Sequence, residues 1–140
     1  MLLTTILAAL FATALSVPLP GGRSPTPDEI RQAATTRNEL LNGPCRNVTV
    51  IFARGTTESG NIGSLVGPAL ESALDARLGS TTVAFQGVDY EANVAGYYAG
   101  GSDTGASTMA SLVNVASSKC PSTQIVLSGY RLAISLLIPS

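Results

Sequence analysis

The fold is constrained most by the stretch Gln124-Ile125-Val126-Leu127-Ser128-Gly129-Tyr130, which Arg131 follows. A short run of Ile, Val and Leu that stops at Gly-Tyr is typical of a buried strand entering a tight turn. Such a strand begins the G-x-S-x-G nucleophile elbow, in which a serine stands on a strained turn between strand and helix. Gly129 and Tyr130 match the first two positions of the elbow. Arg131 and Ala133 stand where the motif has Ser and Gly, so the elbow begins and is not completed.

The composition excludes several classes of protein. The 140 residues suffice for one domain, and 45% hydrophobic with 12% charged residues exclude intrinsic disorder over most of the chain. A formal net charge of −1 without Lys or Arg clusters predicts no nucleic-acid partner and no anionic membrane surface. The sequence has no histidine, which excludes a histidine base and any imidazole metal site. We therefore expect no metal and no cofactor.

The first residues, 1–16, have the pattern of a secretory signal peptide. An apolar run leads to the small-residue pattern Ala14-Leu15-Ser16, although only the α-amino group supplies positive charge at the start. A buried N-terminal helix or a membrane anchor is the alternative. The run is shorter than the ~20 residues that span a bilayer, and Pro18 and Pro20 end it. We therefore expect a secreted, extracellular protein without stable membrane insertion.

Helices and strands are expected to alternate along the rest of the chain. Residues 17–44 are expected to form a pro-segment and an N-terminal helix. In chain order the expected elements are a helix over Pro27–Leu41, a strand over 47–53, a helix over 68–78 capped by Gly79, a strand over 81–86, a long loop over 87–105, a helix over 107–118 and a final strand from residue 124. This order predicts a parallel α/β sheet in three layers, with sites beyond the carboxyl ends of the strands.

Two cysteines, Cys45 and Cys120, each stand just before an expected strand. In a secreted chain the default expectation is that they pair, and two free buried thiols are the alternative. Asn47-Val48-Thr49 matches an N-glycosylation acceptor. We expect it to be unused, because a strand start beside a disulfide is a poor substrate.

Several motifs occur together in one order and spacing, and with these motifs the chain resembles the fungal cutinases from Cys45 to Tyr130. These are secreted serine esterases of the α/β-hydrolase fold. The motifs are Cys45, Ala53-Arg54-Gly55-Thr56-Thr57-Glu58-Ser59-Gly60-Asn61-Ile62-Gly63, Phe85-Gln86-Gly87-Val88-Asp89-Tyr90, Lys119-Cys120-Pro121 and Leu127-Ser128-Gly129-Tyr130. The resemblance implies a three-layer, parallel-sheet α/β-hydrolase whose C-terminal part is missing.

The resemblance also implies a chemistry and several site residues. It implies hydrolysis of esters or of a cutin-like polyester by acyl transfer, in which Ser, His and Asp act together. Thr56 falls on the oxyanion-hole position, where a donor is typically worth about 3 to 4 kcal/mol. Cys45 and Cys120 fall on the paired cysteines of the family. A folded chain is expected to be a monomer.

The chain departs from the family after Tyr130. Arg131 occupies the nucleophile position, so the sequence assigns no catalytic residue, and residues 131–140 form a divergent tail. Ser135 stands outside any elbow and has no base to activate it. We therefore expect the chain as written to be inactive because the triad is absent. The abrupt change after Tyr130 indicates a gene-model or splicing error, a frameshift or a truncated allele. A non-catalytic secreted fragment and a polysaccharide acetyl esterase are the alternatives.

Some residues near the expected site have plainer interpretations. Arg54 and Glu58 are expected to form a structural ion pair that holds their loop. The alternative to an oxyanion role for Thr56 is that it is an ordinary turn residue. Tyr97 and Tyr98 either cover an edge of the sheet or contact substrate.

Overall fold

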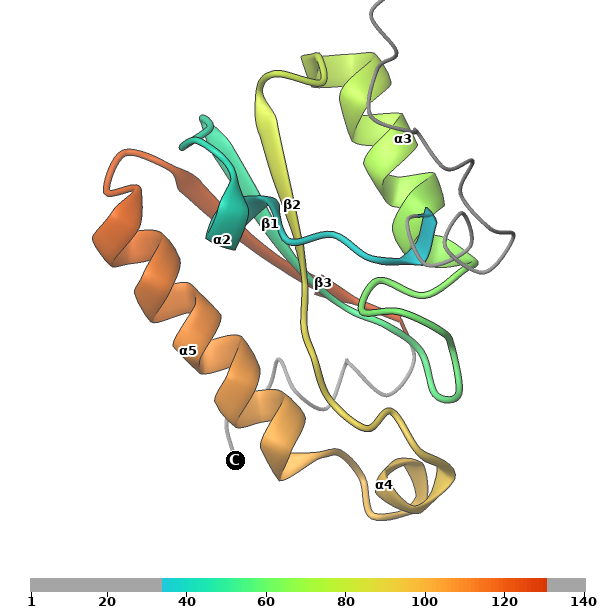
Figure 1. Cartoon of the computed structure of the whole chain (residues 1–140). Helices are drawn as coiled ribbons and strands as arrows, with labels where there is room; N and C mark the ends of the chain where they lie inside the picture. Colours follow the sequence, from blue (N-terminus) through green and yellow to red (C-terminus); the bar gives the residue numbers. More distant parts are fainter. Residues whose placement is uncertain (1–33, 131–140) are drawn as a thin grey trace, which may run out of the picture.

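A parallel sheet lies at the centre of the structure, a computed structural model that describes residues 34 to 130 (Figure 1). Its strands are β1 (Val48–Ala53), β2 (Val83–Gly87) and β3 (Gln124–Gly129), in the spatial order β2-β1-β3. Both pairings are parallel. The predicted strands and their parallel arrangement are therefore confirmed.

Strand β1 is central because its residues are apolar on both faces. Val50 and Phe52 face one core cluster, while Ile51 and Ala53 face the other. All four side chains are buried, as expected for a strand of a parallel sheet that is covered on both sides. The alternation of strand side chains thus divides one short sequence between two cores.

Helices cover the two faces of the sheet (Figure 1). Helix α5 (Asp103–Lys119) packs on one face, and α3 (Val66–Leu78) packs on the other. Helix α5 begins earlier than predicted, because the Ser102 hydroxyl accepts a hydrogen bond from the Gly105 N–H at 3.0 Å and caps it. In α3, Leu70 and Leu74 pack against the core, whereas Leu78 is 47% exposed.

The predicted continuous helix over Pro27–Leu41 is wrong in its described part. Residues 34–35 are helical, residues 36–38 are not, and α2 covers only Glu39–Asn42. The segment before residue 34 lies outside the described residues. The break is caused by contacts with the outer side of strand β2, the side that does not pair with β1.

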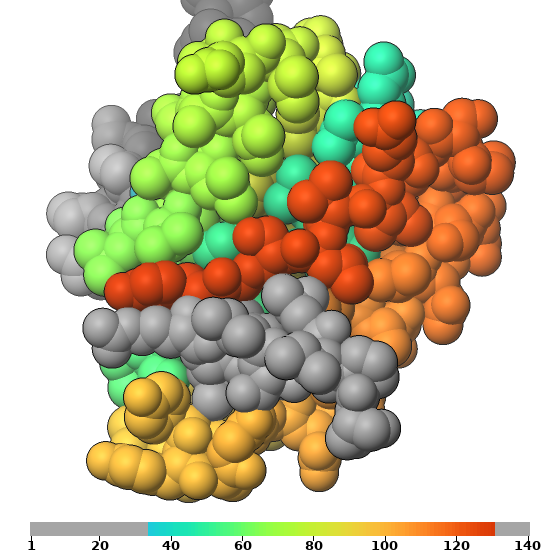
Figure 2. Space-filling view, turned by 180° about the vertical axis from the view of Figure 1, so that it is seen from behind, coloured from blue at the N-terminus to red at the C-terminus, as the bar shows by residue number. Residues whose placement is uncertain are grey.

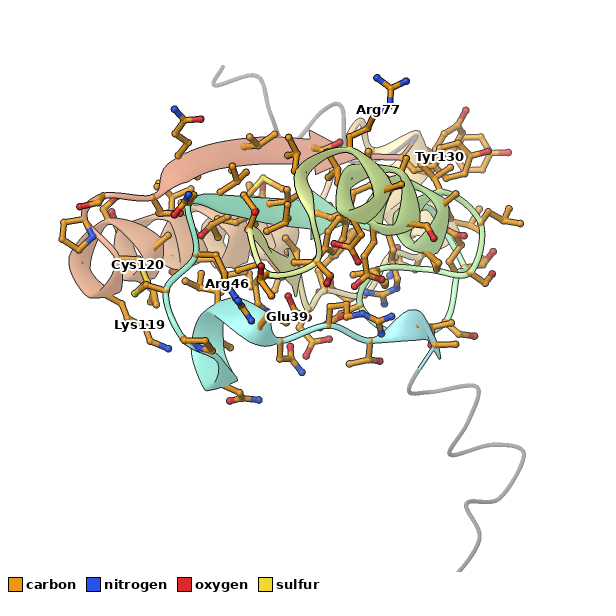
Figure 3. The ribbon with its side chains drawn as sticks, turned by 90° about the horizontal axis from the view of Figure 1, so that it is seen from above. Glu39, Arg46, Arg77, Lys119, Cys120 and Tyr130 are labelled. Carbon is orange, nitrogen blue, oxygen red and sulfur yellow. A yellow bond between two sulfur atoms is a disulfide. The ribbon has the colours of Figure 1, made fainter. Side chains whose placement is uncertain are left out.

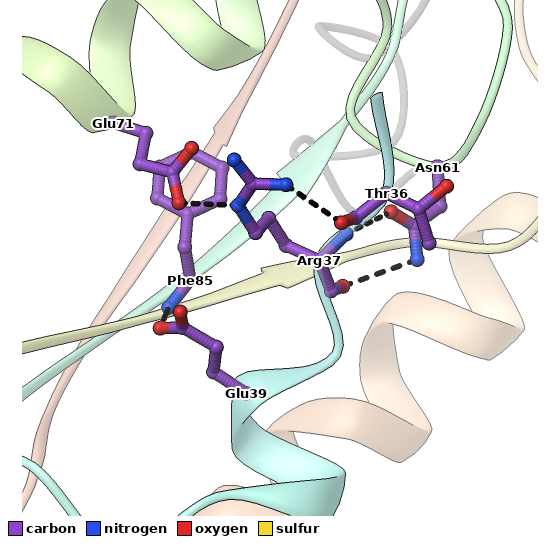
Figure 4. Close-up of polar contacts among 6 residues, drawn as sticks. All are labelled: Thr36, Arg37, Glu39, Asn61, Glu71 and Phe85. Carbon is purple, nitrogen blue, oxygen red and sulfur yellow. Dashed lines mark hydrogen bonds and ion pairs between the residues drawn. The ribbon is translucent and has the colours of Figure 1, made fainter. Parts of the chain in front are cut away.

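Backbone N–H groups on that edge of β2 take their partners from the broken segment. The Glu39 carboxylate accepts a hydrogen bond from Phe85 N–H at 2.9 Å (Figure 4). The Arg37 carbonyl accepts one from Gly87 N–H at 2.9 Å. An unpaired N–H in a buried strand is costly, and an exposed edge is open to pairing with other chains. An extended backbone at this point therefore satisfies groups that a continuous helix would leave unpaired.

Asn61 holds the broken segment in place (Figure 4). Its Oδ1 accepts from Arg37 N–H at 2.9 Å, and its Nδ2 donates to the Arg37 carbonyl at 3.1 Å and to Asn38 Oδ1 at 2.9 Å. The Arg37 guanidinium pairs with Glu71 of α3 at 2.5 Å. Since Asn61 is only 3% exposed, these hydrogen bonds lie largely out of solvent.

A disulfide joins Cys45 to Cys120, with Cα atoms 5.5 Å apart across 75 residues of sequence. The predicted pairing is therefore confirmed. Beside it the Lys119 ammonium donates to three backbone carbonyls at the end of α2, those of Leu40, Leu41 and Gly43. The bond and the ammonium together hold the entry to β1 against the entry to β3.

The predicted loop over 87–105 contains a short helix, α4 (Val94–Tyr98), beyond the carboxyl ends of the strands (Figure 1). The Asn93 side chain caps it by accepting from Gly96 N–H at 2.7 Å. Tyr98 is 83% exposed and its ring meets that of Tyr97 edge to face, so the expectation that the tyrosines cover the sheet edge is not met.

Strand β3 is less buried than predicted. Val126 is 44% exposed and Leu127 is also exposed, because among residues 34–130 the strand pairs with β1 alone. Figure 2 shows β3, in red, crossing the surface between α3 and α5. Within the described part of the chain, no helix has the length and apolar character needed to span a membrane.

We expect Asn61→Ala to lower the free energy of unfolding by about 2 to 4 kcal/mol, because it leaves buried groups of Arg37 and Asn38 without partners. Urea unfolding followed by circular dichroism would measure the change. The matched control is Asn114→Ala on the exposed face of α5, which should leave stability unchanged within about 0.5 kcal/mol. Equal effects of the two substitutions would contradict the role given to Asn61.

Candidate active site

The carboxyl ends of β1 and β3 meet at one edge of the sheet. Ala53 lies opposite Gly129, and Tyr130 N–H donates to the Ala53 carbonyl at 3.0 Å. A side chain at Gly55 would place its Cβ 2.7 Å from the Tyr130 ring, so only glycine allows this approach. Figure 3 shows Tyr130 at this end of the sheet. The structure therefore brings together the loop after β1 and the turn after β3, at the carboxyl ends of the strands where the sequence analysis expects sites.

Arg54 anchors the start of that loop. Its Nε donates to the Glu58 carbonyl at 2.9 Å, and its Nη2 donates to the Tyr90 carbonyl at 2.6 Å. In return the Tyr90 hydroxyl donates to the Arg54 carbonyl at 2.5 Å, and the guanidinium carbon lies 5.1 Å from the centre of the Tyr90 ring. The guanidinium is therefore a buried donor that ties the segments after β1 and β2 together.

The predicted ion pair between Arg54 and Glu58 is wrong, because the Glu58 carboxylate faces backbone amides instead. It accepts from Gly55 N–H at 2.7 Å, from Ser64 N–H at 3.1 Å and from Leu65 N–H at 3.0 Å. The last two amides lie directly before α3, where orphan N–H groups and the helix dipole favour a carboxylate. Glu58 thus closes the loop onto the start of the helix.

The loop carries backbone strain at Thr57, whose φ of 64° is unusual for a β-branched residue. Its N–H donates to the Ala92 carbonyl at 2.7 Å, and Ala92 also has a positive φ, of 44°. Such conformations cost about 1 to 3 kcal/mol each and persist where the surrounding structure enforces them. Here the Arg54, Glu58 and Thr57 hydrogen bonds together enforce the path of the loop.

Thr56 lies between these anchored residues. Its hydroxyl is shielded from solvent, and it has no hydrogen-bond partner among residues 34–130. The same is true of Arg54 Nη1. A buried hydroxyl without a partner is uncommon in folded proteins and needs an explanation. Chemically, it is a donor available to an oxygen atom that arrives at this edge.

The described part of the site supplies hydrogen-bond donors, and the sequence contains no histidine. Burial raises the pKa of Tyr90; the nearby Arg54 charge lowers it, while the Glu58 and Glu91 charges raise it. Hydrogen bonds from its own backbone and from Ser102 and Thr104 lower the pKa of Glu91, which stays ionised. Within residues 34–130, no three His, Cys, Asp or Glu side chains are grouped so as to hold a metal.

The sequence pointed to Thr56 through the resemblance, but it did not reveal the hydrogen bonds of Tyr90 and of the Ser64 amide that hold the loop of Thr56. Both residues belong to other segments of the sequence, Tyr90 after β2 and Ser64 before α3. Only the general rule that sites form at the carboxyl ends of strands points toward Tyr90. Arg131, the expected nucleophile position, lies outside the described residues.

Comparison with known proteins gives a consistent result. Residues 44–135 match the family model described as Cutinase. The chain is 52% identical over 86 residues to the protein named cutinase from Botryotinia fuckeliana, covering 61% of this chain and 43% of that one. It is 44% identical over 126 residues to a probable cutinase 3 from Aspergillus clavatus, covering 87% of this chain and 58% of that one.

A solved structure is also similar. It is that of a Trichoderma reesei cutinase in complex with a C11Y4 phosphonate inhibitor, with 39% identity and a TM-score of 0.65. The match covers 74% of this chain and 45% of that one. The chain thus spans about half the length of the curated relatives it matches.

We expect Glu58→Gln to destabilise the fold by about 1.5 to 3 kcal/mol, because the new amide turns an N–H group toward backbone N–H donors. Denaturant unfolding would measure this cost. Asp89→Asn is the matched control, since Asp89 is exposed and lies near the same edge. A Glu58→Gln variant as stable as the control would show that the three hydrogen bonds contribute nothing.

We expect Tyr90→Phe to cost about 1 to 2 kcal/mol at neutral pH, because the Arg54 carbonyl loses its donor. Burial raises the folded pKa of Tyr90 above its ordinary value of 10.0. Its contribution to stability is therefore complete below about pH 10 and is lost as the pH rises through the folded pKa. Unfolding measured in a series up to about pH 11 should show a smaller fall for Tyr90→Phe than for the parent. Parallel curves would argue against this titration.

Proposed function

Since this chain belongs to the cutinase family, we propose that the protein's activity is the hydrolysis of carboxylic esters, with a cutin-like polyester as substrate class. The family has the α/β-hydrolase fold predicted from the sequence, and the similar solved structure confirms it for this chain. No cofactor is part of the proposal.

One observation carries the proposal, namely the solvent-shielded Thr56 hydroxyl that has no partner among the described residues. It stands on a loop that Arg54 and Glu58 hold beside the end of β3. In acyl transfer the carbonyl oxygen gains negative charge, and a preorganised donor at that oxygen is worth about 3 to 4 kcal/mol. We assign Thr56 this oxyanion role.

The inhibitor of the related Trichoderma reesei enzyme supports this assignment. A phosphonate has a tetrahedral phosphorus with oxygens placed like those of the tetrahedral intermediate in ester hydrolysis. Proteins that bind such groups present donors to a developing oxyanion, which is the chemistry that the Thr56 hydroxyl offers.

The remaining steps of ester hydrolysis need a serine nucleophile, a histidine base and an aspartate. In this sequence Arg131 stands at the nucleophile position, and there is no histidine. We therefore propose that a polypeptide of these 140 residues has the donor for the oxyanion but does not hydrolyse esters.

The setting of the protein follows from the same proposal. We propose that residues 1–16 are a signal peptide, that 17–44 hold the pro-segment and helical region, and that 45–130 form the hydrolase part before a divergent tail over 131–140. The Cys45–Cys120 disulfide supports secretion into an oxidising, extracellular environment. We propose a monomer.

Purified protein of residues 1–140 is expected to hydrolyse a short-chain nitrophenyl ester no faster than a buffer blank. The expectation follows from the lack of a base that could activate a nucleophile. Normal turnover, scaling with protein concentration in independent preparations, would overturn it.

The oxyanion role is tested in the protein that the full transcript encodes. The first step is to sequence that transcript across the codons for residues 127–140 and beyond. If the message reads Gly-Tyr-Ser at the elbow and later supplies Asp and His, we expect Thr56→Val in the encoded protein to lower kcat about 100-fold or more. Thr56→Ser should retain most activity. An unchanged kcat in Thr56→Val would remove Thr56 from the mechanism.

A further inference from the structure

The acceptor motif Asn47-Val48-Thr49 lies at the opposite edge of the sheet from the candidate active site. Asn47 directly precedes β1 and its side chain is exposed. Its neighbour Arg46 lies with Cys120 on the side of the sheet away from Tyr130 (Figure 3). The six residues of β1 separate the two edges by about 20 Å. A group attached to Asn47 would therefore leave the candidate active site open.

The fold uses the two ends of this motif differently. Thr49 is fully buried, and its hydroxyl lies 2.8 Å from that of Thr123. The backbone carbonyl of Asn47 accepts from Gln124 N–H at 2.8 Å. In contrast, no hydrogen bond of the Asn47 side-chain amide is found among residues 34–130. The hydroxyl that defines the motif is thus hidden after folding, while the amide that would carry a sugar points into solvent.

The residues that cover the Thr49 hydroxyl are synthesised long after the acceptor motif. Cys45 and Cys120 are 75 residues apart, and Thr123 and Gln124 follow Cys120. At about 5 to 20 residues per second this separation takes about 4 to 15 s to synthesise. During that time neither the disulfide nor the pairing with β3 can form. The closeness of a strand and a disulfide, which argued against use of the motif, therefore does not restrict an enzyme acting on the growing chain.

The folded surface also has room beside Asn47. A hollow of about 200 Å³ lies there, lined by Cys45, Arg46, Asn47, Cys120, Pro121, Ser122 and Thr123. Its hydroxyl, amide and guanidinium groups are suited to hydrogen bonds with sugar hydroxyls. A glycan at Asn47 would therefore find polar groups beside its point of attachment.

From these observations we propose that Asn47 is a site of N-linked glycosylation, carrying an oligosaccharide over the disulfide end of the sheet. The inference rests on the proposed secretion and is independent of ester hydrolysis. No other asparagine in the sequence is followed two residues later by Ser or Thr, so a single site is predicted. A bulky polar group there would also shield the Cys45–Cys120 disulfide from solvent.

Translation of the full chain in the presence of endoplasmic-reticulum microsomes tests this site without any need for activity. The protease-protected product is expected to show one decrease in mass on treatment with an N-glycosidase. That enzyme converts a glycosylated Asn to Asp, which mass spectrometry can detect in the tryptic peptide of residues 47–54. A protected chain of unchanged mass overturns the proposal, and so does a chain that does not enter the microsomes.

Matched variants locate the glycan. Asn47→Gln and Thr49→Val should abolish the mass change, whereas Thr49→Ser, which preserves the acceptor motif, and Asn114→Gln should retain it. A mass change that persists in Asn47→Gln would overturn the assignment. Because the Asn47 side chain has no described partner, purified Asn47→Gln should also unfold at the same midpoint as the unglycosylated parent.

Discussion

The structure depends on the pairing of β1 with a parallel neighbour on each side. This strand is buried on both faces, and its alternating side chains contribute to two cores. Parallel pairing places all the strand ends of one kind at the same edge of the sheet. The carboxyl edge therefore collects the loop after β1, the segment after β2 and the turn after β3. The amino edge collects the disulfide and the exposed Asn47.

At the carboxyl edge, buried and partly buried polar groups set the path of the loop. Arg54 and Tyr90 exchange hydrogen bonds, and the Glu58 carboxylate takes three backbone amides. Buried charges are tolerated only where such partners satisfy them. With these partners in place, the strained backbone at Thr57 is held, and the adjacent Thr56 hydroxyl has no hydrogen-bond partner among residues 34–130. The hydrogen bonds of Arg54 and Glu58 thus hold the loop that carries Thr56 next to the end of β3.

The two outer strands of the sheet, β2 and β3, differ in how their outer sides are covered. On the β2 side, residues 37–39 supply hydrogen-bond partners to the outer N–H groups, and Asn61 holds those residues in place. On the β3 side, Val126 and Leu127 are exposed in the described part of the chain. Apolar side chains on an edge strand promote association unless something covers them. The β3 side is therefore where the described fold is least protected.

The sequence by itself determined the three strands, their parallel arrangement and the two long helices, and it made the disulfide the default expectation. Each follows from local periodicity, caps or the position of cysteines, which a chain carries before it folds. It also pointed to Thr56, through the resemblance of the surrounding motif. The tertiary structure alone decided the break at residues 36–38, the partners of Glu58 and the clasp between Arg54 and Tyr90. These depend on which unpaired N–H and C=O groups meet after packing, and the 36 positions that separate Arg54 from Tyr90 give no local signal of that meeting.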